Sequence, residues 1–178
     1  MHARRRNRLE ISVTLNPDPD RKGEAFLDIH LTVDGNPLHD TQEHWVDPVD
    51  LAMSAGLSGE MFLYTCSCGD PSCVGIDEGI LVSHEPGQVI WKVREPLAWN
   101  PDEPLPEWTH DVEYHFERRD YVSQVRQAIS RAKELVRSWR APLEKLWVGP
   151  DLSADELLAL DIPHGFGAAV EVDDRMVQ

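Results

Sequence analysis

The sequence predicts an α+β domain, with a mainly antiparallel sheet of about five to six strands, one long amphipathic helix packed on it and a short C-terminal helix. Short segments before residue 118, in which apolar and polar side chains alternate, indicate the strands. Apolar residues at helical spacing over residues 119–139 indicate the long helix. Ser153 and Glu156 have the spacing of a capping box and indicate the start of the short helix. Strands that precede the helices in the chain favour the α+β class.

The first two strands are expected to form a hairpin. Residues 8–15 and 27–33 each alternate apolar with polar positions. Residues 16–20 between them consist of Asn, Asp and Pro, which are typical of turns. Asp34-Gly35 supplies the stop signal after the second strand.

A short helix and three further strands are expected next. Asp47-Pro48 indicates a helix start, and this helix would run through Met53. Residues 60–64 predict a strand that leads into the cysteines. Residues 79–84 and 88–94 predict a second hairpin around a Pro-Gly turn. Its simple register places six residues on the core face, with Ile80, Val82 and His84 opposite Val93, Trp91 and Val89.

The remaining segments complete the predicted domain. Residues 95–109 are rich in proline and predict a loop, whereas residues 112–116 alternate cleanly and predict a strand. The long helix follows directly, with most of its Arg and Lys residues on the face opposite its apolar stripe. We expect residues 1–163 to form a single domain and residues 164–178 to form a flexible C-terminal tail.

Charge restricts the classes of partner. The formal net charge is −15, from 32 acidic and 17 basic residues, so the chain repels nucleic acid and anionic membranes at long range. No Lys or Arg occurs from Gly23 through Trp91, whereas several basic residues gather at 118–140. That basic segment is expected to be the solvated face of the long helix. The alternative interpretation is an acidic surface that receives a basic protein partner.

The expected location is the cytoplasm. The N-terminus is basic, like that of a signal peptide, but an alternating strand pattern follows it where a signal peptide has an apolar region. No apolar run approaches the ~20 residues needed to cross a bilayer. Thiols stay reduced in the cytoplasm, so the cysteines are expected to be available as thiolates.

All three cysteines of the chain lie within one short turn, which is the strongest chemical signal in the sequence. Cys66 and Cys68 are two residues apart, so an extended chain places both side chains on one face. Gly69 and Asp70-Pro71 favour a turn that brings Cys73 back toward them. Three thiolates and a fourth ligand would complete a tetrahedral Zn²⁺ site of structural type. His84 at the end of the hairpin strand is the first candidate for that fourth ligand.

Other ligands and other fates of the cysteines remain open at this stage. The alternatives for the fourth ligand are Asp70, Asp77, Glu78, His110, His115 and a water molecule. His39 and His44 are five residues apart and do not share a strand or helix face, so they are expected to be surface histidines. The cysteines could instead be free and buried, or form a Cys66–Cys73 or Cys68–Cys73 disulfide. A catalytic thiol with His84 as base ranks last, because no Lys or Arg surrounds the cluster.

The cysteine turn resembles a group of uncharacterised bacterial proteins that share a Thr-Cys-Ser-Cys-Gly-x3-Cys core. The similarity extends over roughly residues 60–135 and implies a common fold and a common cysteine turn, without an established activity. The residues that carry it are Tyr64 to Gly69, Cys73, Gly75, Val89 to Trp91, Tyr114 to Phe116 and Tyr121.

Two functions are compared on these observations. The first is a non-enzymatic binding or inhibitor module, stabilised by a small structural zinc site, that caps a basic protein. The second is a metal- or thiol-dependent hydrolase that uses the same cluster with Glu78 or Glu85 as base. We favour the first, because three thiolates quench the Lewis acidity of the metal and the sequence has no His-Glu motif of the metalloprotease type.

Overall fold

The computed structural model describes residues 6–38, 44–94, 111–150 and 152–164. These residues form ten strands, two α-helices and a short third one, and one 3₁₀ turn, so the predicted α+β class is confirmed. The loop predicted at 95–109 and nearly all of the predicted tail at 164–178 lie outside the described residues. The strands divide among three sheets, which the sequence did not indicate.

The first sheet is built on the predicted N-terminal hairpin. β1 (Leu9–Pro17) and β2 (Glu24–Val33) pair antiparallel from Leu9↔Val33 to Pro17↔Ala25. The short strand β3 (Asn36–Pro37) folds back on the end of β2. β10 (Lys145–Trp147) adds a parallel edge at the start of β2, and it was not predicted, because three residues carry too little periodicity.

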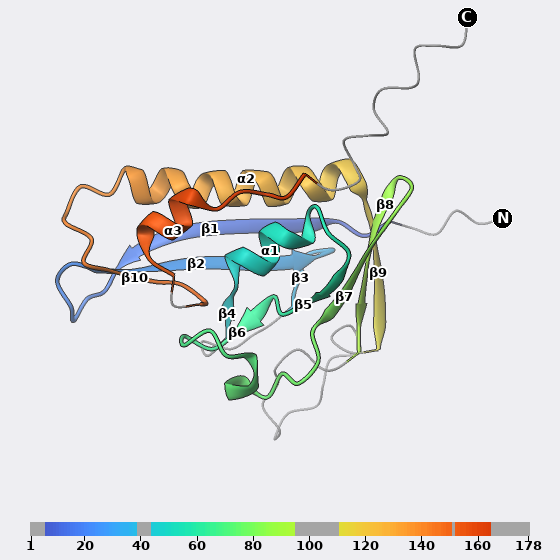
Figure 1. Cartoon of the computed structure of the whole chain (residues 1–178), viewed down its shortest axis with the longest axis horizontal. Coiled ribbons are helices and arrows are strands. Elements are labelled where there is room, and N and C mark those ends of the chain that lie inside the picture. Colours follow the sequence, from blue (N-terminus) through green and yellow to red (C-terminus); the bar gives the residue numbers. More distant parts are fainter. Residues whose placement is uncertain (1–5, 39–43, 95–110, 151, 165–178) are drawn as a thin grey trace, which may run out of the picture.

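The long helix α2 (Arg118–Arg137) confirms the prediction for residues 119–139 and covers the first sheet along β1 (Figure 1). Glu117 caps its start, since the Glu117 carboxylate accepts a hydrogen bond of 2.8 Å from the Asp120 backbone N–H. Its apolar stripe is buried and consists of Tyr121, Val125, Ala128, Ile129, Ala132 and Val136.

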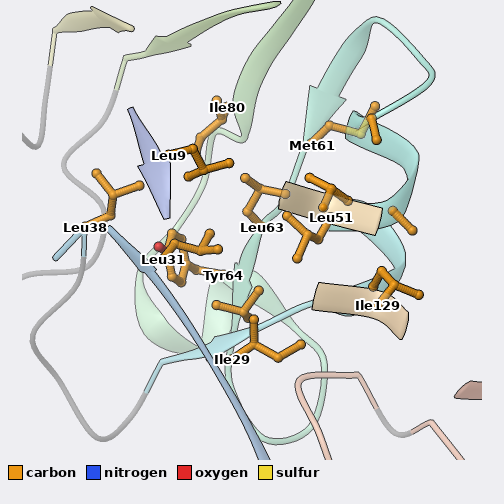
Figure 2. Packing of buried hydrophobic residues seen from close by; sticks show 14 of the residues in the cluster. Leu9, Ile29, Leu31, Leu38, Leu51, Met61, Leu63, Tyr64, Ile80 and Ile129 are labelled. Atoms are coloured by element: carbon orange, nitrogen blue, oxygen red, sulfur yellow. The ribbon is translucent and has the colours of Figure 1, made fainter. Parts of the chain in front are cut away.

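The second sheet has the order β5-β7-β8-β9 and also contacts α2. Its strands are β5 (Gly59–Met61), β7 (Ile80–Glu85), β8 (Gln88–Val93) and β9 (Val112–Glu117). The predicted register is confirmed, since Val82 pairs with Trp91 and His84 pairs with Val89. Strand residues of both sheets meet residues of the helices in one core, part of which Figure 2 shows.

The segment 60–64 is divided between two sheets, although it was predicted to be one strand. β5 ends at Met61, and β6 (Tyr64–Thr65) pairs instead with β4 (Trp45–Val46). The break lies at Phe62, whose backbone N–H donates to the Asp50 carboxylate at 2.6 Å. Asp50 belongs to α1 (Pro48–Ser54), the predicted short helix. A hydrogen bond to this helix therefore holds the chain at Phe62, between the two strands.

The C-terminal helix α3 (Ala154–Ala159) begins at the predicted capping box. The Ser153 hydroxyl accepts from the Glu156 backbone N–H, and the Glu156 carboxylate accepts from the Ser153 backbone N–H. Leu157 is buried and ties this helix to the core. Among the described residues, no helix has both the length and the apolar character that a membrane span requires.

Candidate metal centre

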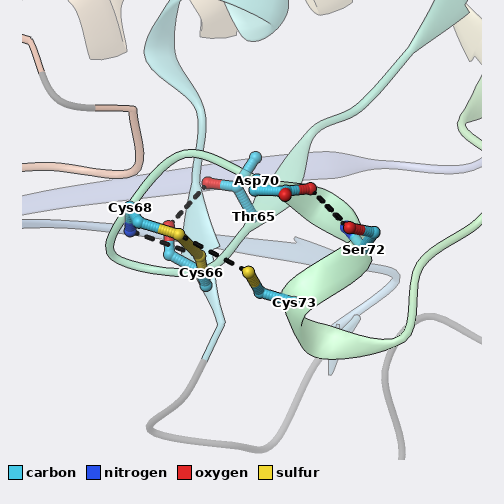
Figure 3. Close-up of a disulfide and its surroundings, with 6 residues drawn as sticks. All are labelled: Thr65, Cys66, Cys68, Asp70, Ser72 and Cys73. Atoms are coloured by element: carbon cyan, nitrogen blue, oxygen red, sulfur yellow. Dashed lines mark hydrogen bonds between the residues drawn. A yellow bond between two sulfur atoms is a disulfide. The ribbon is translucent and has the colours of Figure 1, made fainter.

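The cysteine turn, residues 66–75, is held by its own backbone and by two glycines. The Gly69 backbone N–H donates to the Cys66 carbonyl at 3.0 Å, which closes the first bend. Gly69 and Gly75 have φ of 82° and 74°, the left-handed region that favours glycine. Between them lies η1 (Pro71–Val74), a single 3₁₀ turn that carries Cys73. The sequence therefore builds the predicted return of Cys73 toward Cys66 and Cys68 (Figure 3).

Asp70 fixes the start of η1. Its carboxylate accepts hydrogen bonds from the Ser72 hydroxyl at 2.7 Å and from the Ser72 backbone N–H at 2.9 Å. These two hydrogen bonds hold the pKa of Asp70 below its usual value, and the bond from the Ser72 hydroxyl contributes the most. Figure 3 shows the carboxylate pointing toward Ser72, so Asp70 caps η1, and a weaker interaction with the Cys73 side chain lowers its pKa further.

The three cysteine sulfur atoms converge in space. Their Sγ atoms all lie within 4.8 Å of one another, which is close enough for one metal ion to reach all three. Cys68 Sγ and Cys73 Sγ are 3.6 Å apart, and the Cys68 backbone N–H points at Cys66 Sγ with a distance of 3.2 Å. Cys68 and Cys73 are exposed, and Cys66 is half-buried. No other group of three or more potential ligands converges in this way among the described residues.

Cys66 and Cys68 are joined by a disulfide, and Cys73 is a free, exposed thiol. This bridge differs from both pairings considered from the sequence, Cys66–Cys73 and Cys68–Cys73. The Cα atoms of Cys66 and Cys68 are 5.3 Å apart, less than the ~6.6 Å between residues two apart on an extended strand, because the chain bends here through the Gly69-to-Cys66 hydrogen bond. The extended chain expected at these two cysteines is therefore a turn. A disulfide sulfur is not a thiolate ligand, so the cluster offers three thiolates to a metal ion only after reduction of this bridge.

The structure does not bring His84 to the cysteine sulfurs. Its Nε2–H donates to the Ser54 carbonyl at 2.9 Å, and its Nδ1 accepts from the Arg118 guanidinium at 3.3 Å. Both ring nitrogens are therefore occupied within the fold, in the neutral Nε2–H tautomer. Burial lowers the pKa of His84, and the hydrogen bond to Ser54 partly opposes this shift. The positive charge of Arg118 lowers the pKa by a smaller amount.

The other candidate ligands are also absent from the sulfur cluster. Asp77, Glu78 and His115 do not belong to the converging group. The strand pattern placed His115 on the solvent face, but this residue is only 8% exposed. The segment at Asn7 covers it, and the His115 backbone N–H donates to Asn7 Oδ1 at 2.8 Å. His39 and His110 lie outside the described residues.

Sequence reasoning missed a buried polar hub, which consists of Ser54, His84, Trp91, Arg118 and Tyr121. The Tyr121 hydroxyl lies 2.6 Å from the Ser54 hydroxyl and accepts from the Trp91 indole N–H at 3.1 Å. Ser54 and Trp91 are 0% exposed and Tyr121 is 1% exposed. Burial raises the pKa of Tyr121. The only sequence signal was His84 on the predicted core face, where a histidine requires polar partners.

An open groove of about 800 Å³ lies beside the cysteine turn, with Cys66, Ser67 and Val74 along one part of it. Phe26, Trp45 and Trp147 supply its aromatic lining. The Phe26 ring lies 5.7 Å from the ring of Trp45 and 6.2 Å from that of Trp147. Residues 18–21 form the remainder, with two carboxylates and the Arg21 guanidinium.

Cations of the protein itself already lie over the Trp147 ring. Lys145 Nζ is 3.6 Å from its centroid, and the Arg21 guanidinium carbon is 5.7 Å from it. Both distances fall within the ~6 Å over which cation–π attraction acts. The Trp147 indole N–H donates to the Glu24 carboxylate at 2.5 Å, which orients the ring.

Comparisons with known proteins return no match: no family model, no curated protein and no solved structure resembles this chain significantly.

Proposed function

We propose that the protein is a non-enzymatic binding module whose cysteine turn, when reduced, holds one structural Zn²⁺ ion through Cys66, Cys68 and Cys73. The observation that carries this proposal is the convergence of the three sulfur atoms within 4.8 Å of one another. Zinc prefers thiolate ligands at ~2.3 Å in tetrahedral geometry, which places bound sulfur atoms ~3.8 Å apart. The 3.6 Å between Cys68 Sγ and Cys73 Sγ is close to this spacing, whereas Cys66 Sγ would have to separate from Cys68 Sγ on reduction.

The local backbone also favours thiolates. The Cys68 backbone N–H is directed at Cys66 Sγ at 3.2 Å, and such a bond stabilises negative charge on sulfur. Metal binding would tie residues 66–75 together, a segment in which η1 has no buried residue. The fourth ligand would come from water, since Cys68 and Cys73 face solvent and both ring nitrogens of His84 are bonded elsewhere.

Elemental mass spectrometry of the reduced protein, purified without an affinity tag, tests the zinc site. We expect one zinc ion per chain and three titratable thiols after denaturation in chelator. Cys73→Ser should lose the ion, whereas Ser67→Ala in the same turn should keep it and controls for damage to the turn. Absence of zinc from the reduced wild-type protein after incubation with equimolar Zn²⁺ would contradict the proposal.

The partner that we propose is a basic protein, docked at the groove beside the turn. The segment from Gly23 through Trp91 has no Lys or Arg, and it supplies apolar and small polar residues to the groove, whose carboxylates and Arg21 come from residues 18–21. Asp18 and Asp20 line the groove, and its Trp147 ring already accepts cations. A lysine or arginine side chain of a partner would meet the carboxylates of Asp18 and Asp20, and would have to displace Lys145 or Arg21 to reach the Trp147 ring.

Calorimetric titration with an oligoarginine peptide tests the docking surface. We expect binding that weakens as salt is added and that falls in the double variant Asp18→Asn, Asp20→Asn. The charge-matched double variant Glu85→Gln, Asp120→Asn changes residues that do not line the groove and controls for net charge. Equal weakening by both double variants would show that the peptide responds only to net charge, and would contradict docking at the groove.

A further inference from the structure

We infer that the oxidised, metal-free cluster is a thiol–disulfide exchange site in which Cys68 is the shared sulfur, alternately bonded to Cys66 and to Cys73. This inference goes beyond zinc binding and does not rest on it, because it concerns the state in which Cys66 and Cys68 form a disulfide. Its basis is a free thiol held beside one particular sulfur of a disulfide.

The geometry selects which sulfur is attacked. Cys73 Sγ lies 3.6 Å from Cys68 Sγ, about the contact distance of two sulfur atoms. Cys73 is held there by η1, which Asp70 caps at one end and Gly75 ends at the other. Exchange requires three nearly collinear sulfur atoms, whereas Cys66 Sγ and Cys73 Sγ lie within 4.8 Å of each other on a bent path through Cys68, so the Cys73 side chain must rotate before it attacks. The short turn keeps the Cys73 thiolate close to the disulfide while it does so, which raises its local concentration there.

The exchange step is balanced without any oxidant or reductant. Cys73 loses its proton to solvent, and its thiolate forms a new S–S bond to Cys68 Sγ. The bond between Cys66 and Cys68 breaks, and its electron pair leaves with Cys66 Sγ as a thiolate, which then takes a proton from solvent. The product has a Cys68–Cys73 disulfide and a free Cys66, and the same step in reverse restores the first state.

Cys66 Sγ, the sulfur that leaves as a thiolate, has a hydrogen-bond donor beside it that would stabilise its negative charge. The Cys68 backbone N–H already points at Cys66 Sγ at 3.2 Å and would donate to the thiolate formed there. Cys73 and Cys68 are exposed while Cys66 is half-buried, so exchange would move the free thiol from an exposed to a less accessible position. The cluster would thereby control how readily an external thiol reagent reaches a free cysteine.

Disulfide mapping tests this inference on the full chain, oxidised and kept in chelator. Acid quenching stops exchange because the thiolate is the nucleophile, and maleimide then labels the free thiol. Cleavage before aspartate at Asp50, Asp70 and Asp77 separates residues 50–69, with Cys66 and Cys68, from residues 70–76, with Cys73. We expect two products: residues 50–69 bridged internally with label on Cys73, and residues 50–69 linked to 70–76 with label on Cys66.

Two variants sharpen the result. Cys66→Ser should form the Cys68–Cys73 bridge on mild oxidation, whereas Cys68→Ser should leave Cys66 and Cys73 as free thiols, with both variants checked for folding by circular dichroism. Wild-type label found on Cys73 alone, after prolonged incubation before quenching, would overturn the exchange. Formation of a Cys66–Cys73 bridge in Cys68→Ser as readily as Cys68–Cys73 in Cys66→Ser would overturn the role of Cys68 as the shared sulfur.

Discussion

The cysteine turn and the buried polar hub are two polar clusters of the same chain, with opposite surroundings. In the hub, Ser54, Trp91 and Tyr121 are almost fully enclosed and satisfy one another across α1, β8 and α2. In the turn, Cys68 and Cys73 face solvent, and the hydrogen bonds that hold the loop run within residues 65–76. The hub therefore stabilises the fold, whereas the turn is free to carry chemistry.

The difference explains the place of His84. A histidine is the commonest partner of cysteines at a zinc site, but its ring here lies within the hub, bonded to Ser54 and Arg118. If the two clusters are independent, changes in the hub should alter global stability without altering zinc binding. Changes in the turn should alter zinc binding but leave the stability of the metal-free protein unchanged.

The largest expected effect is on metal affinity, in Cys73→Ser. Loss of an outer-shell hydrogen bond alone weakens metal binding by ~10–100-fold, so loss of one of three thiolates should weaken it by more than about a hundredfold. The metal-free variant should unfold within ~0.5 kcal/mol of wild type, because Cys73 is exposed. Competition with a chromogenic chelator and urea denaturation measure the two quantities. A large loss of metal-free stability would contradict the separation of the two clusters.

The next effect is on stability, in Tyr121→Phe. Removing the hydroxyl leaves the buried Trp91 N–H without this acceptor, whereas the Ser54 hydroxyl still donates to the Leu51 carbonyl. We expect a loss of ~1–3 kcal/mol in the free energy of unfolding, measured by urea denaturation. Zinc content per folded chain should not change. Reduced zinc content in the folded variant would show that the hub supports the metal centre.

A smaller effect is expected for His84→Asn, which removes the ring and with it the bonds to Ser54 and Arg118. The free energy of unfolding should fall by ~1 kcal/mol, the typical net value of a lost hydrogen bond. Zinc affinity should equal that of the wild type. A tenfold or greater loss of zinc affinity would instead identify His84 as the fourth ligand.

A further effect concerns the pH dependence of stability. The pKa of His84 is lowered from 6.5 in the folded state, so below about pH 6.5 the unfolded chain binds more protons and stability falls as pH falls. Burial raises the pKa of Asp47, the N-cap of α1, from 3.8 to about 6. Between these two pH values the folded chain therefore binds more protons than the unfolded chain. The stability that protonated Asp47 contributes to the fold is lost as pH rises from 4 to 6.

The variant Asp47→Asn separates the pH dependence of stability due to Asp47 from the opposite dependence due to His84. Asn keeps a capping oxygen but has no charge, so stability should rise more steeply with pH between 4 and 6 than in the wild type. Urea denaturation at a series of pH values measures the slope, for which one proton corresponds to ~1.4 kcal/mol per pH unit. Parallel profiles of wild type and Asp47→Asn would contradict the raised pKa of Asp47.

The fold was predictable wherever a single segment was long enough to show the alternation of a strand, the apolar spacing of a helix or a capping signal. The hairpins, α1, α2 and the cap of α3 followed from alternation, helical spacing and Ser153. The division of residues 60–64 was not predictable, because it depends on a hydrogen bond from Phe62 to a helix carboxylate. The strand β10 was too short to detect and is held by pairing with β2.

For the candidate site, local information was sufficient for the cysteines and insufficient for their surroundings. Residues two apart, followed by a turn, place Cys66, Cys68 and Cys73 together without help from the rest of the chain. The environment of His84 depends on Ser54 and Arg118, which are about thirty residues away on either side. The aromatic groove likewise joins β2, β4 and β10, whose proximity no single segment reveals.

The central claim is that one metal ion is held by three thiolates of the turn and by no residue of the hub. Titration of the reduced, metal-free protein with Co²⁺ tests it most directly, since cobalt bound by thiolates gives intense sulfur-to-metal charge-transfer absorption. We predict a charge-transfer band that saturates at one equivalent, persists in His84→Asn and falls in each of the three Cys→Ser variants. A band that is absent, or that survives the loss of any one cysteine at full intensity, would contradict the claim.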